Sequence, residues 1–212
     1  MLHLPVSLGE AIDKLTILDI KLDKITDNRR DDVKKEYDLL YDKLQEFIVK
    51  YENLYQIMKR VNLLIWDMMD ILRDLAIEDD AQYLKICRDC IEYNDIRFRV
   101  KNKINFVSMS LLKEQKSYKI NRMVIVLKHE LFLHDVFAQI IKYFSFMYDE
   151  VNVVSDRSLD KLKDTFSYDT TILFKPLSSP LLEHKKIYTV EHDDADLYKL
   201  FEVDVARVLA FN

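Results

Sequence analysis

Glycine is almost absent from this chain, whose 212 residues contain a single one, Gly9. Phosphate-binding loops need several glycines, because only residues without a side chain let backbone N–H groups approach a phosphate closely. The sequence therefore excludes a Walker-type loop and a dinucleotide-binding fingerprint. It equally excludes the G-x-S-x-G turn that presents the nucleophile of many serine hydrolases.

Cysteine is also scarce, and the two that occur, Cys87 and Cys90, are one helical turn apart in sequence. Without a second pair, one chain cannot build a disulfide framework or a four-ligand zinc site. We therefore expect a reducing compartment, no metal and no cofactor. We interpret both cysteines as small buried helix residues, with a transient redox or metal role as the alternative.

Long apolar runs and an excess of one charge are missing too. No segment stays uncharged for the ~18 residues of a membrane span, and residues 1–5 lack the pattern of a secretion signal. The 32 basic and 37 acidic side chains leave a net charge of -5, which gives no field that attracts nucleic acid. We expect a cytoplasmic protein that binds neither nucleic acid nor membranes. Its richness in Lys, Ile, Asp, Asn and Tyr is typical of AT-rich genomes, viral ones included, and for a virus the location is the host cytoplasm or the virion.

The first half of the chain has helical periodicity. Ser7 and Glu10 form a capping box before an apolar stripe that ends at Ile25. After a polar turn, a heptad pattern runs over residues 33–75 without glycine or proline, which predicts a long helix, continuous or bent near Asn62. The short turn favours an antiparallel helical hairpin. Because the second helix is longer than the first, part of its seam needs a third helix or a second copy of the chain.

A third helix is predicted from Glu78-Asp79-Asp80 to about Leu111, and after residue 118 the period changes. Short β-branched runs predict strands at 123–127, 151–154, 171–174 and 187–190, separated by helices at 136–147 and 159–166 and followed by one at 194–209. Strands that alternate with helices indicate a parallel sheet. We therefore predict an α+β or α/β protein with a helical domain, 1–118, and a small Rossmann-like α/β domain, 119–212.

Polar residues follow each predicted strand, at the edge where open parallel sheets bind ligands. The set comprises Lys128, His129, Glu130 and His134, then Ser155, Asp156 and Arg157, then Lys175, then Glu191, His192, Asp193 and Asp194. Among them, Glu130, His134, Asp156 and His192 are the candidates for acid, base or phosphate-binding roles. The alternative is an ordinary polar surface. The five-residue step from His129 to His134 does not fit a zinc protease, which needs a step of four.

The helical half carries a second polar set. Asn62, Trp66, Asp70 and Arg73 share one helical face, and Asn94, Arg97, Lys101 and Asn105 share another. Buried charges must be paired, and Asp70 with Arg73 or Arg97, and Glu10 with Lys14, are the pairs that spacing offers. One interpretation is a set of interhelical hydrogen bonds that fixes register. The other is a polar ligand pocket beside Trp66.

These positions belong to an ordered series of motifs. The series is Val6-Ser7-x-Gly9-Glu10-x-x-Asp13-Lys14-x-Thr16-Ile17-Leu18, Val61-Asn62 with Trp66-Asp67-x-x-Asp70-x-x-Arg73, Asn94-Asp95-x-Arg97 with Lys101-x-x-Ile104-Asn105, and Lys116-Ser117-Tyr118. It resembles an uncharacterised bacterial and viral family over about residues 4–118, and members of that family often lie among polysaccharide-assembly and glycosyltransferase genes. The second half is similar to the N-terminal part of a GT-B type glycosyltransferase domain, but it lacks the glycine-rich first loop expected there. The resemblance implies no established activity, but it marks Asp95 and ten further residues of the series as motif positions. These ten are our candidates for ligand binding, namely Glu10, Asp13, Lys14, Asn62, Trp66, Asp70, Arg73, Asn94, Arg97 and Lys101.

Two functional hypotheses follow from the patterns and the resemblance. The first is an accessory or assembly protein of glycan synthesis or modification that uses its long helices to form a homodimer or to dock onto a glycosyltransferase. The second is an enzyme that acts on a sugar or nucleotide sugar at the carboxyl ends of the C-terminal strands. We prefer the first, because an assembly surface is readable in the sequence and a catalytic constellation is not.

Overall fold

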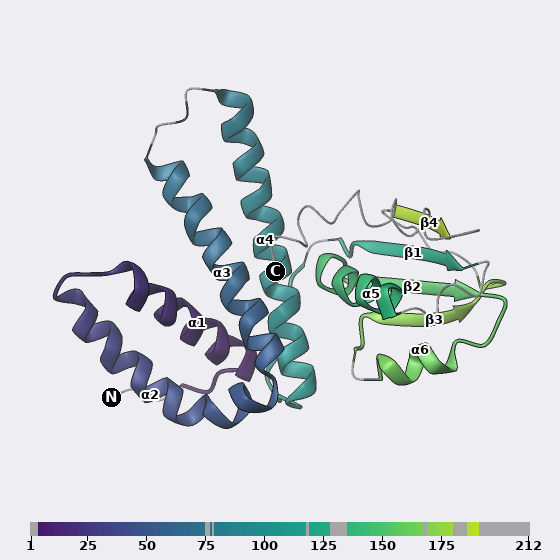
Figure 1. Cartoon of the computed structure of the whole chain (residues 1–212), viewed down its shortest axis with the longest axis horizontal. Helices are drawn as coiled ribbons and strands as arrows, with labels where there is room; N and C mark the ends of the chain where they lie inside the picture. The colour runs from purple at the N-terminus through teal and green to yellow at the C-terminus, as the bar shows by residue number, and fades with distance from the viewer. Residues whose placement is uncertain are drawn as a thin grey trace. The chain divides into compact units, whose positions relative to one another are not determined.

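The computed structural model describes residues 4–74, 77, 79–117, 119–127, 135–167, 169–179 and 186–190. The chain divides into two compact units, Met1–Gln115 and Lys116–Asn212. The first contains four helices and the second a parallel sheet with helices (Figure 1). The predicted fold class, a helical first half followed by a small parallel-sheet unit, is confirmed.

Helix α1 (Leu8–Lys24) begins at the predicted cap. Ser7 has extended backbone angles, and its hydroxyl oxygen accepts a hydrogen bond from the N–H of Glu10 at 3.1 Å. This contact satisfies one of the backbone donors that every helix start leaves free. The carboxylate of Glu10 accepts a hydrogen bond from Lys101 of another helix.

The long heptad region forms two helices, α2 (Arg29–Lys50) and α3 (Glu52–Arg73), and the break falls at Tyr51 rather than near Asn62. Packing explains the break, because α2 lies along α1 as an antiparallel hairpin whereas α3 contacts both α1 and α4. The Tyr51 ring stands 4.8 Å from that of Phe47, and its hydroxyl donates to the carbonyl oxygen of Val107 at 3.4 Å. Tertiary contacts thus override an uninterrupted helical sequence.

Helix α4 (Asp80–Val107) starts at the predicted acidic cluster, where the side chain of Asp79 accepts a hydrogen bond from Ala81 N–H. The core of the helical unit lies where α1, α3 and α4 meet. Its fully buried side chains include Ile12, Leu15, Met58, Val61, Val100 and Ile104.

The far ends of α3 and α4 extend beyond this core as a two-helix projection (Figure 1). Buried residues of α3 end at Asn62, and those of α4 begin at Tyr93. We call residues 63–73 of α3 and 80–92 of α4 the distal arm. Among the described helices, none combines the length and apolarity required to cross a membrane.

The second unit is built on a four-stranded sheet with the order β3-β2-β1-β4. The strands are β1 (Arg122–Leu127), β2 (Glu150–Ser155), β3 (Ile172–Pro176) and β4 (Lys186–Val190). All three neighbouring pairs are parallel, as predicted. Each predicted apolar run coincides with one of these strands to within a residue or two.

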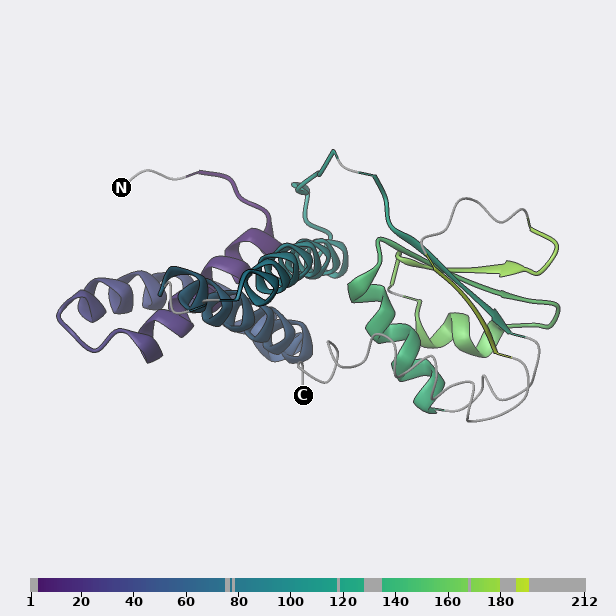
Figure 2. The ribbon, with the colours of Figure 1, turned by 90° about the horizontal axis from the view of Figure 1, so that it is seen from above.

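Helices α5 (Asp135–Met147) and α6 (Asp160–Thr165) lie on one face of the sheet (Figure 2). Phe137 and Phe144 of α5 pack there against the strands. Val124, Val126 and Val154 form a second buried cluster. Burial on both faces explains why β1 is a continuous apolar run from Met123 to Leu127 rather than an alternating one. The predicted closing helix at 194–209 lies outside the described residues.

Candidate functional site

The carboxylate of Asp13 lies at the centre of a hydrogen-bond network between three helices. Asp13 of α1 is 1% exposed, and Arg97 of α4 donates to both of its oxygens, from Nε at 2.8 Å and from Nη2 at 2.6 Å. The amide of Asn62 in α3 donates to Asp13 at 2.8 Å and to the hydroxyl of Thr16 at 2.9 Å. The sequence offered no pairing for Asp13, and the structure gives it a bidentate one.

A second ion cluster surrounds the buried ammonium group of Lys101 on α4. It contacts the carboxylate of Glu10 at 3.0 Å and also that of Glu114, which follows the helix. Burial opposes the charge, but the hydrogen bonds that Lys101 donates to Glu114 and then to Glu10 outweigh it and raise the pKa of Lys101. Asp13 has the same effect on the pKa of Arg97, again against burial. Both cations therefore stay charged at neutral pH.

The only glycine, Gly9, lies where the backbone of α1 comes very near α4. The N–H of Gly9 donates to the side-chain oxygen of Asn105 at 2.7 Å. A Cβ atom at this position would lie 2.5 Å from the carbonyl oxygen of Lys101 and 2.9 Å from the side-chain oxygen of Asn105. The backbone can come this close to α4 only because Gly9 has no side chain.

Other motif positions lie apart from this network. Lys14 pairs with Glu36 of α2 on the surface, not with Glu10. Asp70 pairs with Arg73 at 3.5 Å on the exposed side of α3, not with Arg97. Sequence spacing identifies neighbours on one helix, whereas the buried pairs join residues more than 80 positions apart.

Trp66 and Asn94 also stand outside the Asp13 and Lys101 clusters. Trp66 is half-buried on α3, within the distal arm, and Asn94 is exposed on α4. The predicted polar stripes of α3 and α4 are thus joined through Asp13 of α1, at Asn62 and Arg97. The network holds three helices in register and leaves Asp13 saturated with donors.

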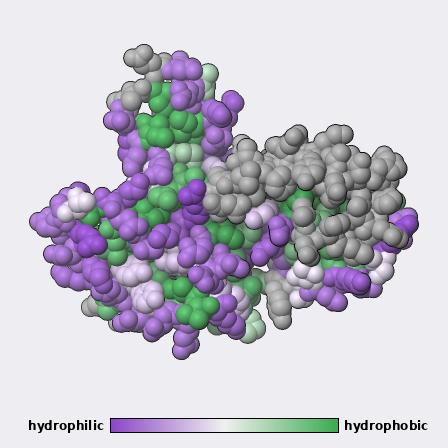
Figure 3. All heavy atoms as spheres, viewed as in Figure 1, coloured by the Kyte–Doolittle hydropathy of each residue, from purple (hydrophilic) through white to green (hydrophobic). Residues whose placement is uncertain are grey.

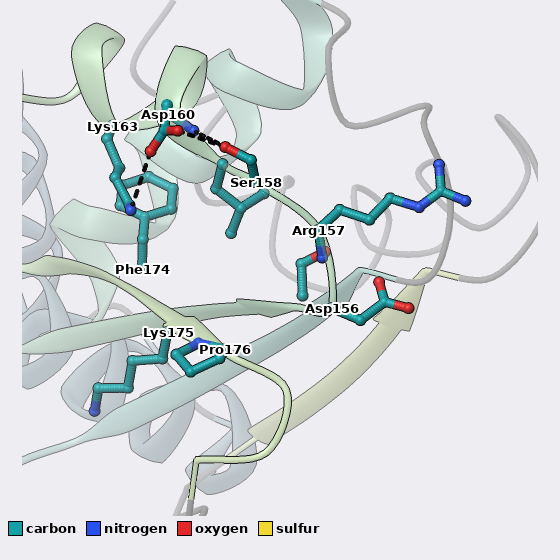
Figure 4. A pocket seen from close by; sticks show the side chains of 10 residues that line it. Asp156, Arg157, Ser158, Asp160, Lys163, Phe174, Lys175 and Pro176 are labelled. Atoms are coloured by element: carbon teal, nitrogen blue, oxygen red, sulfur yellow. Dashed lines mark hydrogen bonds and ion pairs between the residues drawn. The ribbon is translucent and has the colours of Figure 1, made fainter.

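The second unit has a pocket of about 210 Å³ at the carboxyl ends of β2 and β3 (Figure 4). It brings together Ser155, Asp156, Arg157 and Lys175, which the sequence placed after two different strands. Parallel strands end at the same edge, which explains why residues about 20 positions apart line one cavity. Asp156 is the one catalytic candidate that the structure describes. Glu130, His134 and His192 lie outside the described residues.

Three further polar residues line this pocket, and sequence reasoning did not select them. The hydroxyl of Ser158 donates to Asp160 at 2.5 Å, and Lys163 contacts the same carboxylate at 3.3 Å (Figure 4). Ser158 and then Lys163 lower the pKa of Asp160. A serine just before a short helix was the available signal, because serine commonly caps helix starts. Within the described residues, no group of three His, Cys, Asp or Glu side chains is placed to hold a metal ion.

The distal arm is a third candidate site. Eight of the eleven residues at 63–73 are apolar, yet none of them is fully buried. On α4, Leu84 is 53% exposed and Ile91 is 65% exposed. Figure 3 shows apolar surface along this projection, bordered by hydrophilic residues. An apolar surface of this kind, rimmed by polar groups, is typical of a protein–protein contact.

Fold and sites together define a protein with a four-helix unit held by buried ion pairs and a small parallel α/β unit. The chain belongs to DUF6165, a family of unknown function, whose model matches residues 2–127. The match covers all four helices of the first unit and continues to the end of β1. No curated protein and no solved structure gives a significant match.

Proposed function

We propose that this protein is an accessory protein of glycan assembly that self-associates through its distal arm. The observation that carries the proposal is the apolar composition of the arm together with the absence of fully buried residues in it. Two helices that pack only on each other leave the remaining sides of each helix exposed to solvent. In the proposed dimer, the distal arm of a second copy covers these exposed apolar side chains.

The hydrophobic effect gives the physical reason for association. Burial of apolar surface contributes about 25 cal/mol per Å², so a half-exposed leucine or isoleucine side chain gains on the order of 1 kcal/mol when it is covered. Leu84, Ile91 and, on α3, Ile71 at 47% exposure are such side chains. Exposed apolar side chains therefore lie on both helices of the distal arm.

Light scattering on the purified chain tests the proposal, with Leu84→Asp as the disruptive variant. Leu39→Asp is the matched control, because Leu39 is a 54% exposed leucine on α2, outside the distal arm. We expect wild type and Leu39→Asp to dimerise and Leu84→Asp to be monomeric. A monomeric wild type, or a dimer that both variants weaken equally, contradicts the proposal.

The link to glycans rests on the motif resemblance, in which related genes lie among polysaccharide-assembly genes. In this proposal the protein acts in the cytoplasm, where cysteines such as Cys87 and Cys90 stay reduced. Deletion of the gene should change the amount or the chain length of a surface or capsid-linked glycan. Unchanged glycans in the deletion strain would contradict the role in glycan assembly and would leave self-association as a separate property.

The second candidate function is binding of a sugar phosphate or nucleotide sugar at the pocket between β2 and β3. The supporting observation is that Arg157 and Lys175 line one cavity with Ser155 and Asp156. Thermal-shift measurements with uridine diphosphate sugars test it, and Lys175→Ala should abolish any stabilisation. Lys161→Ala is the control, because Lys161 is an exposed lysine of α6 that does not line the pocket. Equal melting temperatures with and without ligand argue against this function.

A further inference from the structure

The two cysteines of the chain, Cys87 and Cys90, lie within the distal arm on α4. Both are free and partly exposed, so the expectation that they are buried core residues holds only in part. Residues three positions apart on a helix are neighbours on one face, with Cβ atoms about 5–6 Å apart. The two thiols are therefore adjacent, and a small molecule in solution can reach them.

The helical spacing of the two cysteines comes near to that of a disulfide but does not match it. With a rise of ~1.5 Å per residue, Cα atoms three positions apart on a helix are about 5 Å apart. This distance lies within the range of about 4.4–6.8 Å that disulfides span, but the Cβ atoms of a disulfide must lie within about 3.5–4.5 Å. A bond between Cys87 and Cys90 therefore requires the helix to distort at residues 87–90.

This part of α4 can distort without disturbing the core of the helical unit. The buried residues of α4 begin at Tyr93, and none lies within 80–92. A distortion at 87–90 separates residues 80–86 from the rest of the helix. That segment is too short to stay helical by itself, because isolated helices of fewer than about 12–15 residues are marginal in water. The part of α4 beyond Tyr93 remains packed in the core.

We propose that Cys87 and Cys90 form a reversible redox site, in which an intrachain disulfide unwinds the distal part of α4. The oxidant is a small-molecule disulfide such as oxidised glutathione. The Cys87 thiolate attacks one sulfur of this molecule and displaces a first thiolate, and Cys90 then attacks the mixed disulfide on Cys87 and displaces the second. The two released thiolates take up the protons that the cysteines lose, so one oxidant molecule becomes two thiols.

The surroundings of the thiols support this order of attack. Burial, and then the neighbouring Cys87, raise the pKa of the Cys90 thiol. Cys90 therefore forms less thiolate than an ordinary cysteine, which disfavours a first attack on a molecule in solution. Its attack on the mixed disulfide is intramolecular, and proximity favours that step. Disulfides of this transient kind serve redox sensing in the cytoplasm.

The redox site also gives a means of regulating the distal arm, a step that rests on the proposed self-association. Leu84 is 53% exposed and lies in the segment that the disulfide separates from α4. When this segment unwinds, Leu84 is no longer held in the arrangement that a second copy covers. The reduced chain should therefore dimerise, and the oxidised chain should be monomeric.

Treatment of the full chain with glutathione buffers of decreasing reduced-to-oxidised ratio tests the site. Mass spectrometry under non-reducing conditions identifies the product, and hydrogen exchange reports on the helix. We expect a chain lighter by two hydrogen atoms, in which the amides of 80–90 exchange at least about tenfold faster than in the reduced chain. The amides of 97–107 should be unchanged, and a thiol reductant should reverse both effects.

Serine variants separate the roles of the two thiols. Cys90→Ser should stop at one glutathione per chain, because the resolving thiol is missing. The variant that combines Cys87→Ser with Cys90→Ser is the control for other effects of the oxidant, since the chain has no further cysteine. By light scattering, this control should dimerise in every buffer, whereas the wild type should dissociate on oxidation.

The outcomes separate the redox site from the proposed function. No reaction, two glutathiones per chain, a disulfide between two chains, or an intrachain disulfide that leaves the exchange of 80–90 unchanged overturns the redox site. A chain that forms the disulfide and unwinds, but is monomeric even when reduced, overturns self-association and leaves the redox site intact. A dimer that persists after the segment has unwound overturns the regulatory step.

Discussion

Replacement of Gly9 by alanine sets two physical effects against each other. Gly9 is the second residue of α1, and its backbone does not require a positive φ angle. Helix propensity alone therefore predicts a gain of up to about 1 kcal/mol for alanine. The contact with α4 predicts the opposite, because the new methyl group would lie 2.5 Å from the backbone oxygen of Lys101.

The contact should win. Overpacking of a close interface costs about 1–3 kcal/mol, and a backbone oxygen cannot rotate away as a side chain can. If the helices separate, the buried bond from the Gly9 N–H to Asn105 lengthens or breaks, at a cost of about 1–3 kcal/mol. Together these exceed the propensity gain, and we expect Gly9→Ala to destabilise the helical unit by about 1–5 kcal/mol.

Urea unfolding followed by tryptophan fluorescence measures this change. Trp66 is the only tryptophan and lies in α3, so its signal reports the helical unit. With a slope of about 1–3 kcal/mol per molar urea, the midpoint should fall by roughly 1 M. Lys14→Ala, at an exposed position of the same helix, should leave it within about 0.3 M. A Gly9→Ala protein as stable as wild type, or more stable, would refute the close approach of α1 and α4.

Three further substitutions test other parts of the structure. Asp13→Ala should cost about 3–5 kcal/mol in the same assay, because Arg97 loses its bidentate partner; a loss below 1 kcal/mol would contradict a structural role. Burial and then Asp19 raise the pKa of Tyr55 above its ordinary 10.0, so above pH 10 the Tyr55 hydroxyl ionises in the unfolded chain but not in the folded one, and the free energy of unfolding should fall as pH rises. Tyr55→Phe should make this fall less steep. An unchanged slope would exclude Tyr55 as its cause. Phe137→Ala, in the core of the sheet unit, should cost about 3–5 kcal/mol by thermal denaturation, whereas a surface residue would cost almost nothing.

The sheet was predictable because its signal is local. The run at Met123–Leu127 is apolar throughout and the run at Val151–Val154 is apolar except for Asn152, and both are rich in β-branched residues, as is typical of strands buried on both faces. Alternation with helices then implies parallel pairing, and the pairs of β1 with β2 and β4 have that direction. Strand order depends on contacts between distant segments, so only the structure supplies it.

The break at Tyr51 was not predictable from local sequence. No glycine or proline marks it, and the heptad continues through it. The helix ends there because α1 is too short to support one long partner, so the chain turns and packs α3 on both α1 and α4. The hydroxyl contact of Tyr51 with Val107 joins residues 56 positions apart, which periodicity cannot detect.

The candidate sites were predictable as sets of residues but not as pairs. Motif positions such as Asp13 and Arg97 were selected, but spacing offered no partner for Asp13 and offered Asp70 for Arg97, whereas the structure pairs Asp13 with Arg97. The strand-end rule succeeded for Asp156 and Lys175, because every parallel strand ends at one edge of the sheet.

Hydrogen exchange at low and high protein concentration tests the role of the distal arm most directly. Helices with few buried contacts open locally, so the amides of 63–73 and 80–92 should exchange quickly in the monomer. The account predicts that these amides, and not those of α2, become protected as the concentration rises. Protection that is independent of concentration, or that appears on α2 instead, would contradict it.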